Sequence, residues 1–129
     1  MRLNAVIKMK QRVAILFGMV PFVCFGQTYT INPTDSMVVN APFNTYSHFI
    51  IEQHNTTGSY IRLGWEQLSV NIPSGWVADL CDLGNCFTGF PTGGIMDTVF
   101  AGDYGLLSGA VDPLNITGTG LVRYSVWDL

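Results

Sequence analysis

The sequence predicts one all-β domain, an antiparallel β-sandwich of about seven or eight short strands that follows an amino-terminal leader. Three observations indicate this fold class. Short apolar segments with two-residue alternation recur along residues 27–129, and turns rich in glycine, proline and asparagine separate them. No window after residue 26 carries the apolar periodicity of an amphipathic helix. No internal repeat or linker divides this part of the chain, so we expect a single domain.

Residues 1–26 have the layout of a cleavable secretory signal peptide. A basic start precedes the apolar run Val13–Phe25, and Cys24 and Gly26 place small residues shortly before Gln27. The run would span about 20 Å as a helix, short of the bilayer core of about 30 Å. We therefore expect cleavage after Gly26 and no membrane span afterwards. A lipidated Cys24 is the alternative, but Val23 stands where that processing favours a small residue.

The domain that remains, residues 27–129, is strongly acidic. It holds two arginines, no lysine and nine aspartates and glutamates, which gives a net charge of −7. Nucleic acid binding and attraction to anionic lipid both require a basic surface. We therefore expect no nucleic acid partner. The acids are scattered along the chain, which favours a solvated surface over a calcium site.

The first strands are expected at Thr28–Ile31 and Ser36–Val39, on either side of a turn at residues 32–35. The proline of this turn cannot donate to a central ladder, so the two segments are compatible with one broken edge strand. Thr45–Gln53 is the next predicted strand, with apolar residues on both faces. Residues 54–58 then indicate a hairpin connection.

Ser59–Ile72 is predicted as a long strand whose apolar residues change parity in the middle. Before the change they are Ile61, Leu63 and Trp65, and after it they are Leu68, Val70 and Ile72. Because side chains alternate between the two faces of a strand, a regular strand would turn the second set away from the core. We therefore predict a bulge near Trp65–Gln67.

The carboxyl-terminal half predicts four more strands and one long loop. The strands are Trp76–Leu80, Ile95–Ala101, Leu106–Val111 and Leu121–Trp127, and the loop is Phe87–Gly94. In the last strand, alternation directs Val122, Tyr124 and Val126 inward and Arg123 and Ser125 outward.

Cys81 and Cys86 flank a tight turn, and in an exported protein a disulfide is the default for such a pair. The loop-entropy relation gives it a stabilisation of about 2 kcal/mol. A redox motif would have two intervening residues, and this pair has four. His48 and His54 complete a set of four candidate metal ligands, but their spacing matches no zinc or blue-copper pattern. The sequence therefore predicts no metal site.

No catalytic motif is present. The H-E-x-x-H, G-x-S-x-G and EF-hand patterns are missing, and Gly118–Gly120 lacks the third glycine of a dinucleotide fingerprint. Acids for a glycosidase pair are abundant, but the sequence does not place two of them at a fixed separation. We expect no enzyme, no catalytic residue and no cofactor.

An aromatic platform for a sugar is the alternative use of the three tryptophans, Trp65, Trp76 and Trp127. Core packing is the competing explanation for all three. Trp127 is the best platform candidate because Arg123 and Ser125 share its face by alternation.

The central stretch resembles a module that recurs in secreted proteins of the Bacteroidota. The matching motifs are an N-T-S-like turn, a strand ending in tryptophan, a P-x-G-W motif, a C-D…C-F pair and a closing G-T-G-x-V strand. Here they are Asn55–Thr57, Trp65, Ile72–Trp76, Cys81–Phe87 and Gly118–Val122, with Thr57 where the family usually has serine. The resemblance covers roughly residues 45–127.

The resemblance implies a non-catalytic, immunoglobulin-like sandwich that is exported to the periplasm, the cell surface or the extracellular space. Many such modules precede a sorting domain for type IX secretion. None follows Leu129 in this sequence, so the expectation is a shortened gene product or a periplasmic protein. Ser36 and Thr98 lie in Asp-Ser/Thr-hydrophobic segments that resemble the O-glycosylation signal of that phylum. Asn55 and Asn115 fit the N-glycosylation pattern of eukaryotic hosts.

The sequence thus favours an exported binding or structural module at the cell envelope, with a protein or a polysaccharide as partner. The alternative is a small carbohydrate-binding or hydrolytic domain that uses an exposed tryptophan and surface acids. A third hypothesis is a subunit completed by a partner strand along Leu121–Trp127.

Overall fold

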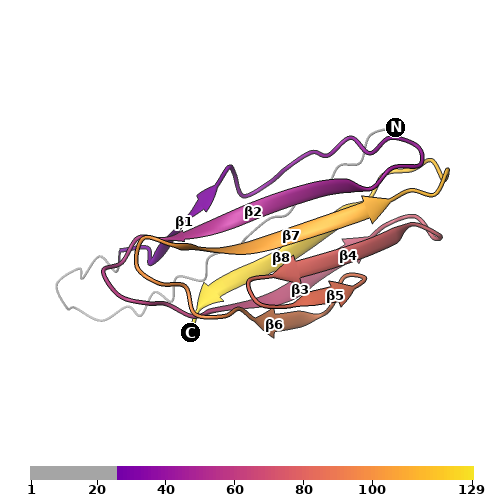
Figure 1. Cartoon of the computed structure of the whole chain (residues 1–129). Coiled ribbons are helices and arrows are strands. Elements are labelled where there is room, and N and C mark those ends of the chain that lie inside the picture. Colours follow the sequence, from indigo (N-terminus) through magenta and orange to yellow (C-terminus); the bar gives the residue numbers. More distant parts are fainter. Residues whose placement is uncertain (1–25) are drawn as a thin grey trace, which may run out of the picture.

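The computed structural model describes residues 26–129, which form eight strands (Figure 1). The predicted leader, with Cys24, lies outside the described residues apart from Gly26. The strands are β1 (Tyr29–Asn32), β2 (Ser47–Asn55), β3 (Leu63–Asn71), β4 (Val77–Asp82), β5 (Cys86–Thr88), β6 (Gly93–Ile95), β7 (Tyr104–Asp112) and β8 (Leu121–Asp128).

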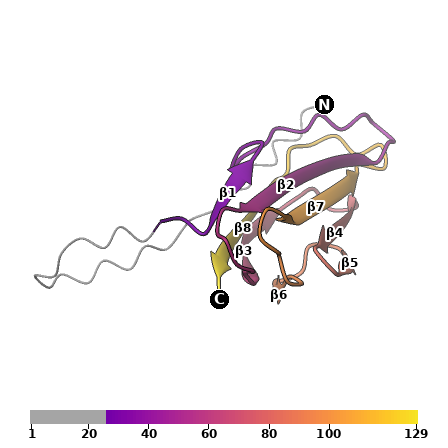
Figure 2. The ribbon, with the colours of Figure 1, turned by 60° about the vertical axis from the view of Figure 1, so that its left-hand side comes forward.

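The strands form two antiparallel sheets that face each other (Figure 2). The larger sheet has the order β1-β2-β7-β4-β5, and the smaller has the order β6-β3-β8. This arrangement confirms the prediction of an all-β sandwich of seven or eight strands.

The strand order follows the immunoglobulin arrangement. In constant-type immunoglobulin domains one sheet has the order A-B-E-D, and in the other strand F lies between C and G. Here β1-β2-β7-β4 takes the order A-B-E-D, and β3-β8 takes the order C-F. The short strands β5 and β6 are additions between D and E. Among residues 26–129, no strand takes the place of G beside β8.

The core lies between the two sheets and is centred on Trp65. Its largest fully buried side chains come from both layers: Phe49, Ile51, Leu80 and Leu107 from the larger sheet, and Leu63, Trp65 and Tyr124 from the smaller. The Trp65 ring meets Tyr124 and Phe87 edge-on, with ring centroids 5.4 and 5.8 Å apart. Such edge-to-face pairs add to the burial energy of the rings.

The last strand and the predicted bulge are confirmed, with one correction. Val122, Tyr124 and Val126 are buried as expected. The ladder between β3 and β8 shifts register between Gln67 and Ser69, and Val70 and Ile72 pack on the core. The expectation for Leu68 was wrong: it lies in the bulge and is 47% exposed. The extra residue of a bulge is left out of the alternation, so it need not face the core.

Two predictions near the amino terminus were wrong. Ser36–Val39 is not a ladder strand: Val39 alone forms a β-bridge, and Met37 and Val39 pack on the core from a connecting segment. Residues 54–58 are not a hairpin connection, because β2 belongs to the larger sheet and β3 to the smaller. This connection leads from the larger sheet to the smaller sheet.

The prediction for residues 87–101 was also wrong in part. The expected loop at 87–94 contains most of β5 and the start of β6. β6 pairs with β3 at Gly93 and Gly94, where a Cβ would lie 2.8 Å from the Trp65 carbonyl oxygen and 2.6 Å from its indole, respectively. The expected strand at 95–101 ends at Ile95, and beyond it only Val99 forms a bridge, with Ile61.

Gly109→Ala should lower the free energy of unfolding by about 2 kcal/mol, because overpacking forces neighbouring groups to move. Gly109 pairs with Phe49 across β2 and β7, and a Cβ there would lie 2.0 Å from the tip of the Phe49 ring. Urea unfolding would measure the loss. A smaller side chain at the facing position, Phe49→Leu, should reduce the added cost of Gly109→Ala. Equal cost in both backgrounds would contradict this account.

Candidate binding surfaces

The outer face of the smaller sheet carries the predicted ligand platform. Gly64 on β3 pairs with Trp127 on one side and Ile95 on the other. A Cβ on Gly64 would lie 2.8 Å from the Trp127 indole, so the indole lies over the glycine. Trp127 is 37% exposed and Ile95 is 50% exposed. These three residues form an apolar row across the sheet, which we call the Trp127 row.

Arg123 lies on the same outer face, four residues before Trp127 along β8. It pairs directly with Ser69 on β3, beside the bulge. The Arg123 Nε and the Ser69 Oγ are both buried, and neither has a hydrogen-bond partner among the described residues. The structure therefore confirms that Trp127 and Arg123 share a face. It adds two facing polar groups whose hydrogen-bonding capacity is unused.

Carboxylates do not gather around Trp127. Among the acids within the strands, only Glu66 shares its face, and Glu66 accepts a hydrogen bond from the Ser125 hydroxyl at 3.3 Å. By alternation, Glu52, Asp79 and Asp112 lie on the outer face of the other sheet. A pair of acids flanking one sugar, as most glycosidases require, is not assembled by these strands.

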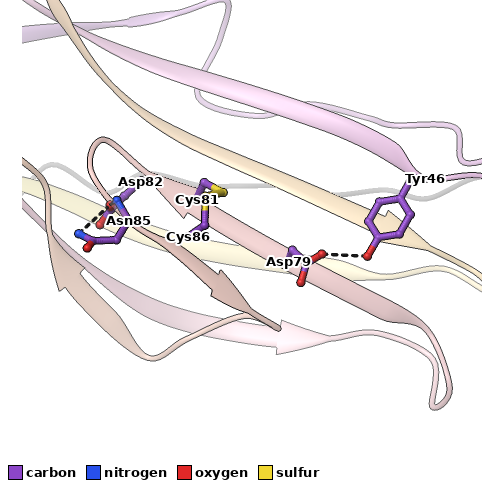
Figure 3. Close-up of a disulfide and its surroundings, with 6 residues drawn as sticks. All are labelled: Tyr46, Asp79, Cys81, Asp82, Asn85 and Cys86. Atoms are coloured by element: carbon purple, nitrogen blue, oxygen red, sulfur yellow. Dashed lines mark hydrogen bonds between the residues drawn. A yellow bond between two sulfur atoms is a disulfide. The ribbon is translucent and has the colours of Figure 1, made fainter.

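The predicted Cys81–Cys86 disulfide is present and joins β4 to β5 (Figure 3). The two cysteines are directly opposite in the ladder, with Cα atoms 4.0 Å apart. The turn between them is closed by Asp82, whose Oδ1 accepts from the Asn85 backbone N–H at 2.9 Å. The second oxygen, Oδ2, accepts from Trp65 Nε1 at 2.9 Å, which links the hairpin to the opposite sheet.

The outer face of the larger sheet holds an acid–phenol contact. Tyr46 reaches across β7 and donates to the Asp79 carboxylate on β4 at 2.8 Å (Figure 3). This hydrogen bond is the main reason that the pKa of Tyr46 lies above its usual value of 10.0. The contact ties the start of β2 to β4 and gives Tyr46 a structural role.

Glu52 forms a second polar cluster on this face. Its Oε2 accepts from Asn32 Nδ2 at 2.7 Å and lies 2.7 Å from His54 Nε2. The bond from Asn32, and after it the bond with His54, hold the pKa of Glu52 below its ordinary value of 4.5. A carboxyl group whose pKa is lower in the folded than in the unfolded protein stabilises the fold at pH values above its unfolded pKa. That contribution is lost as the pH falls through the lowered value.

Asn32→Ala should therefore raise the pKa of Glu52 toward 4.5, and His54→Ala should raise it by less. An NMR titration of the Glu52 carboxyl carbon measures both shifts. An unchanged Glu52 titration in Asn32→Ala would refute the role given to Asn32.

In residues 26–129 no group of three or more histidines, cysteines or acids could hold a metal ion. His48 instead faces Tyr46, with ring centroids 6.1 Å apart, and His54 packs on Tyr104 at 5.1 Å. Within the same residues there is no helix long and apolar enough to cross a membrane.

The proposed modification residues differ in accessibility. Ser36 is exposed in the connection after β1, whereas Thr98 is half-buried beside buried Val99. Asn115 is exposed in the β7–β8 connection with a positive φ of 63°. Asn55 is only 5% exposed and its amide is fully hydrogen bonded, so the folded domain does not present it for glycosylation.

Comparisons with protein-family models, with curated proteins and with solved structures find no match to this chain. The functional assignment therefore depends on the geometry of its own surfaces.

The sequence offered an edge position for Leu121–Trp127 only as a hypothesis. Alternation identifies which residues of β8 face outward, but strand order decides that β8 lies at a sheet edge. No sequence signal separated an edge from a central position, because β8 contains neither proline nor lysine, the residues that commonly mark edges.

Proposed function

We propose that this chain is an exported, non-catalytic immunoglobulin-like module that binds a partner, or has a structural role, at the cell envelope. The Cys81–Cys86 bond carries the proposal, because disulfides persist in oxidising compartments and are rare in the cytosol. The signal-peptide layout of residues 1–26 and the resemblance to secreted Bacteroidota modules agree with export.

The dispersed acids support a binding role over catalysis. Among the carboxylates within the strands, Glu66 lies on one outer face, Glu52, Asp79 and Asp112 lie on the other, and Asp82 is buried in structural hydrogen bonds. An enzyme that acts on a small substrate would bring such groups together in one concave site. A surface that recognises a partner needs no such convergence.

The test is the intact mass of the protein from cell fractions, before and after reduction and alkylation. We expect an envelope or secreted species that begins at Gln27 and takes up alkylating reagent at Cys81 and Cys86 only after reduction. A surplus mass that maps to Ser36 or Thr98 would add O-glycosylation. A cytoplasmic species that keeps its leader, or cysteines that react without reduction, would refute export.

A carbohydrate-binding role is the second candidate, and the exposure of Trp127 above Gly64 favours it. A flat indole on a sheet surface is a stacking surface for a sugar ring. Trp127→Ala should then abolish retention on the polysaccharide that binds the parent protein in an affinity-gel screen. Tyr60→Ala removes an aromatic ring that is more exposed than Trp127 and lies outside the strands, and it is the control. Equal retention of both variants would exclude the Trp127 row as a sugar site.

A further inference from the structure

The Cys81–Cys86 disulfide lies on the outer face of the larger sheet. Along β4 the neighbours of Cys81, Leu80 and Asp82, are buried between the layers, so alternation directs Cys81 outward. Cys81 is half-buried, and Cys86 is exposed. β5, which carries Cys86, is the outermost strand of this sheet among residues 26–129. The bond is therefore accessible to a thiol that approaches from solvent.

The hairpin that carries the disulfide is also closed by other contacts (Figure 3). The Asp82 N–H donates to the Asn85 carbonyl at 2.8 Å, and the Asp82 carboxylate accepts from the Asn85 N–H at 2.9 Å. On the inner side of β5, Phe87 packs edge-on against Trp65. Because none of these contacts involves a sulfur atom, we expect them to hold β5 beside β4 after the bond is broken.

The ladder brings the two sulfur atoms together. The backbone bond between Asp82 and Asn85 sets its phase, so the next pair, Cys81 and Cys86, is a non-hydrogen-bonded pair. Side chains approach each other most closely in such pairs. The Cα atoms of the two cysteines are 4.0 Å apart. Reduction should therefore leave two adjacent thiols, and the bond can form again without a change of fold.

Loop length and exposure distinguish this bond from a buried structural cross-link. It joins cysteines with a sequence separation of only 5. In the loop-entropy account, a disulfide that closes a short loop stabilises a protein less than one that closes a long loop. Exposed disulfides are also more readily reduced by thiols than buried structural ones.

The surroundings of the pair are those of a substrate of thiol–disulfide exchange, not of a catalyst. Disulfides that oxidise other proteins carry a helix start or a cation beside the reactive thiolate. Residues 26–129 contain no helix and no lysine, and their two arginines, Arg62 and Arg123, lie outside the larger sheet. The strand neighbour on the same face as Cys81 is an acid, Asp79. The attacking thiolate must therefore come from a partner.

We propose that Cys81–Cys86 is a reversible redox site, which a dithiol protein of the cell envelope reduces by attack on Cys86 while the domain stays folded. The inference goes beyond the proposed function and rests on it only for the export of the chain. Cys86 is the attacked residue because it is exposed on the outermost strand. Cys81 lies between β5 and β7, where it pairs with Ser108.

The exchange has two steps. The first thiolate of the partner forms a bond with Cys86 Sγ, the bond between the two cysteines breaks, and its electron pair leaves on Cys81 Sγ, which takes a proton from solvent. The second thiolate of the partner then attacks the partner's own sulfur in the mixed disulfide. This attack releases Cys86 Sγ, which is protonated in turn. Two electrons pass to this protein, and the partner dithiol becomes a disulfide.

The first experiment measures whether the folded protein can be reduced. The isotope-labelled exported chain is incubated in native buffer with about a tenfold excess of reduced thioredoxin, used as the dithiol protein, and is then alkylated. We expect alkylation of both Cys81 and Cys86, and an amide NMR spectrum of the reduced protein that keeps the dispersion of a folded sandwich. Resistance to reduction until denaturant is added, or loss of the dispersed spectrum on reduction, would overturn the proposal.

The second experiment identifies the attacked sulfur. The single-cysteine variants Cys81→Ser and Cys86→Ser are each loaded with thionitrobenzoate, which is the better leaving group, so the attacking thiolate bonds to the protein sulfur. Thioredoxin with one reactive cysteine should release the coloured thionitrobenzoate at least about tenfold faster from Cys86 than from Cys81. Each variant is the matched control for the other, and thermal melting verifies that both are folded. Equal rates, or faster release from Cys81, would refute the role of Cys86.

The third experiment tests whether the thiols stay adjacent. Phenylarsine oxide loses its oxygen as water when it bridges two neighbouring thiols. The reduced protein should bind the arsenical across Cys81 and Cys86, and Cys81→Ser should not form the bridge. A reduced protein that is folded but forms no bridge would show that the hairpin opens, which contradicts the proposal.

Failure of this proposal is distinguishable from failure of the proposed function. If the disulfide resists thioredoxin while the intact mass still shows export and the bond, only the redox site is refuted. If the exported protein contains free thiols at Cys81 and Cys86 before any reduction, the observation that carries the proposed function is lost as well.

Discussion

Asn55→Ala should lower the free energy of unfolding by about 3 kcal/mol, because a buried amide with four partners is replaced by a methyl group. Asn55 Nδ2 donates to the carbonyls of Ser59 and Val99 at 2.7 and 3.1 Å. Its Oδ1 accepts from the Thr57 N–H and hydroxyl, both at 2.8 Å. The side chain thereby joins the end of β2 to the connection between the sheets and to the segment before β7.

Thermal and urea unfolding of Asn55→Ala would measure this loss, with a fall in the melting temperature of about 15 °C for a domain of this size. Asn55→Asp is the informative partner variant, because a carboxylate accepts from Thr57 but cannot donate to the two carbonyls. It should be at least as destabilising at neutral pH. The exposed residue Asn71 serves as control, and Asn71→Ala should stay within about 0.5 kcal/mol of the parent. A loss below about 1 kcal/mol for Asn55→Ala would contradict the role assigned to Asn55.

Asp82→Ala should cost about 3 kcal/mol, because the buried Trp65 N–H and the Asn85 backbone N–H both lose their acceptor. Asp82 is 5% exposed, and it accepts from Trp65 Nε1 and from the Asn85 backbone N–H at 2.9 Å each. Without the carboxylate, the indole N–H is left in the core with no partner. The disulfide hairpin also loses its side-chain bond to the opposite sheet.

A double-mutant cycle with Trp65→Phe tests the Asp82 account. Phenylalanine has no N–H, so in the Trp65→Phe background Asp82→Ala should cost about 2 kcal/mol less than in the parent. Asp35→Ala, at an exposed acid, should stay within about 0.5 kcal/mol. If the cost of Asp82→Ala is the same in both backgrounds, the Trp65–Asp82 bond contributes nothing measurable to stability.

The strands with clean alternation were predictable. In Leu121–Trp127 the residues Val122, Tyr124 and Val126 face the core as expected, because one-sided burial leaves a two-residue signature. The strand at Thr45–Gln53 was also predicted, but its outer face is not covered as expected, since Tyr46 and Ile50 are exposed. The bulge was predictable for the same reason, since the parity change in β3 has to be absorbed somewhere. The disulfide was predicted because a cysteine pair in an exported protein forms a disulfide by default.

The segments for which the sequence-based prediction was wrong lack this two-residue alternation. β5 and β6 are three residues each, too short to show alternation, and β6 owes its pairing to two glycines that let β3 approach. Between Ile95 and Ala101, Met96 and Val99 are both buried although they differ in parity. This segment is held by contacts from Asn55 and Ile61, which are distant in the sequence.

The sequence by itself determined that this protein is an acidic, all-β domain with one disulfide and with Trp127 and Arg123 on a common face, because charge, spacing and alternation are local properties. Only the tertiary structure decided which sheet each strand joins, that Asp82 receives the Trp65 N–H, and that β8 lies at the edge of the smaller sheet among residues 26–129. Strand order depends on contacts between residues far apart in the chain, and no local pattern encodes it.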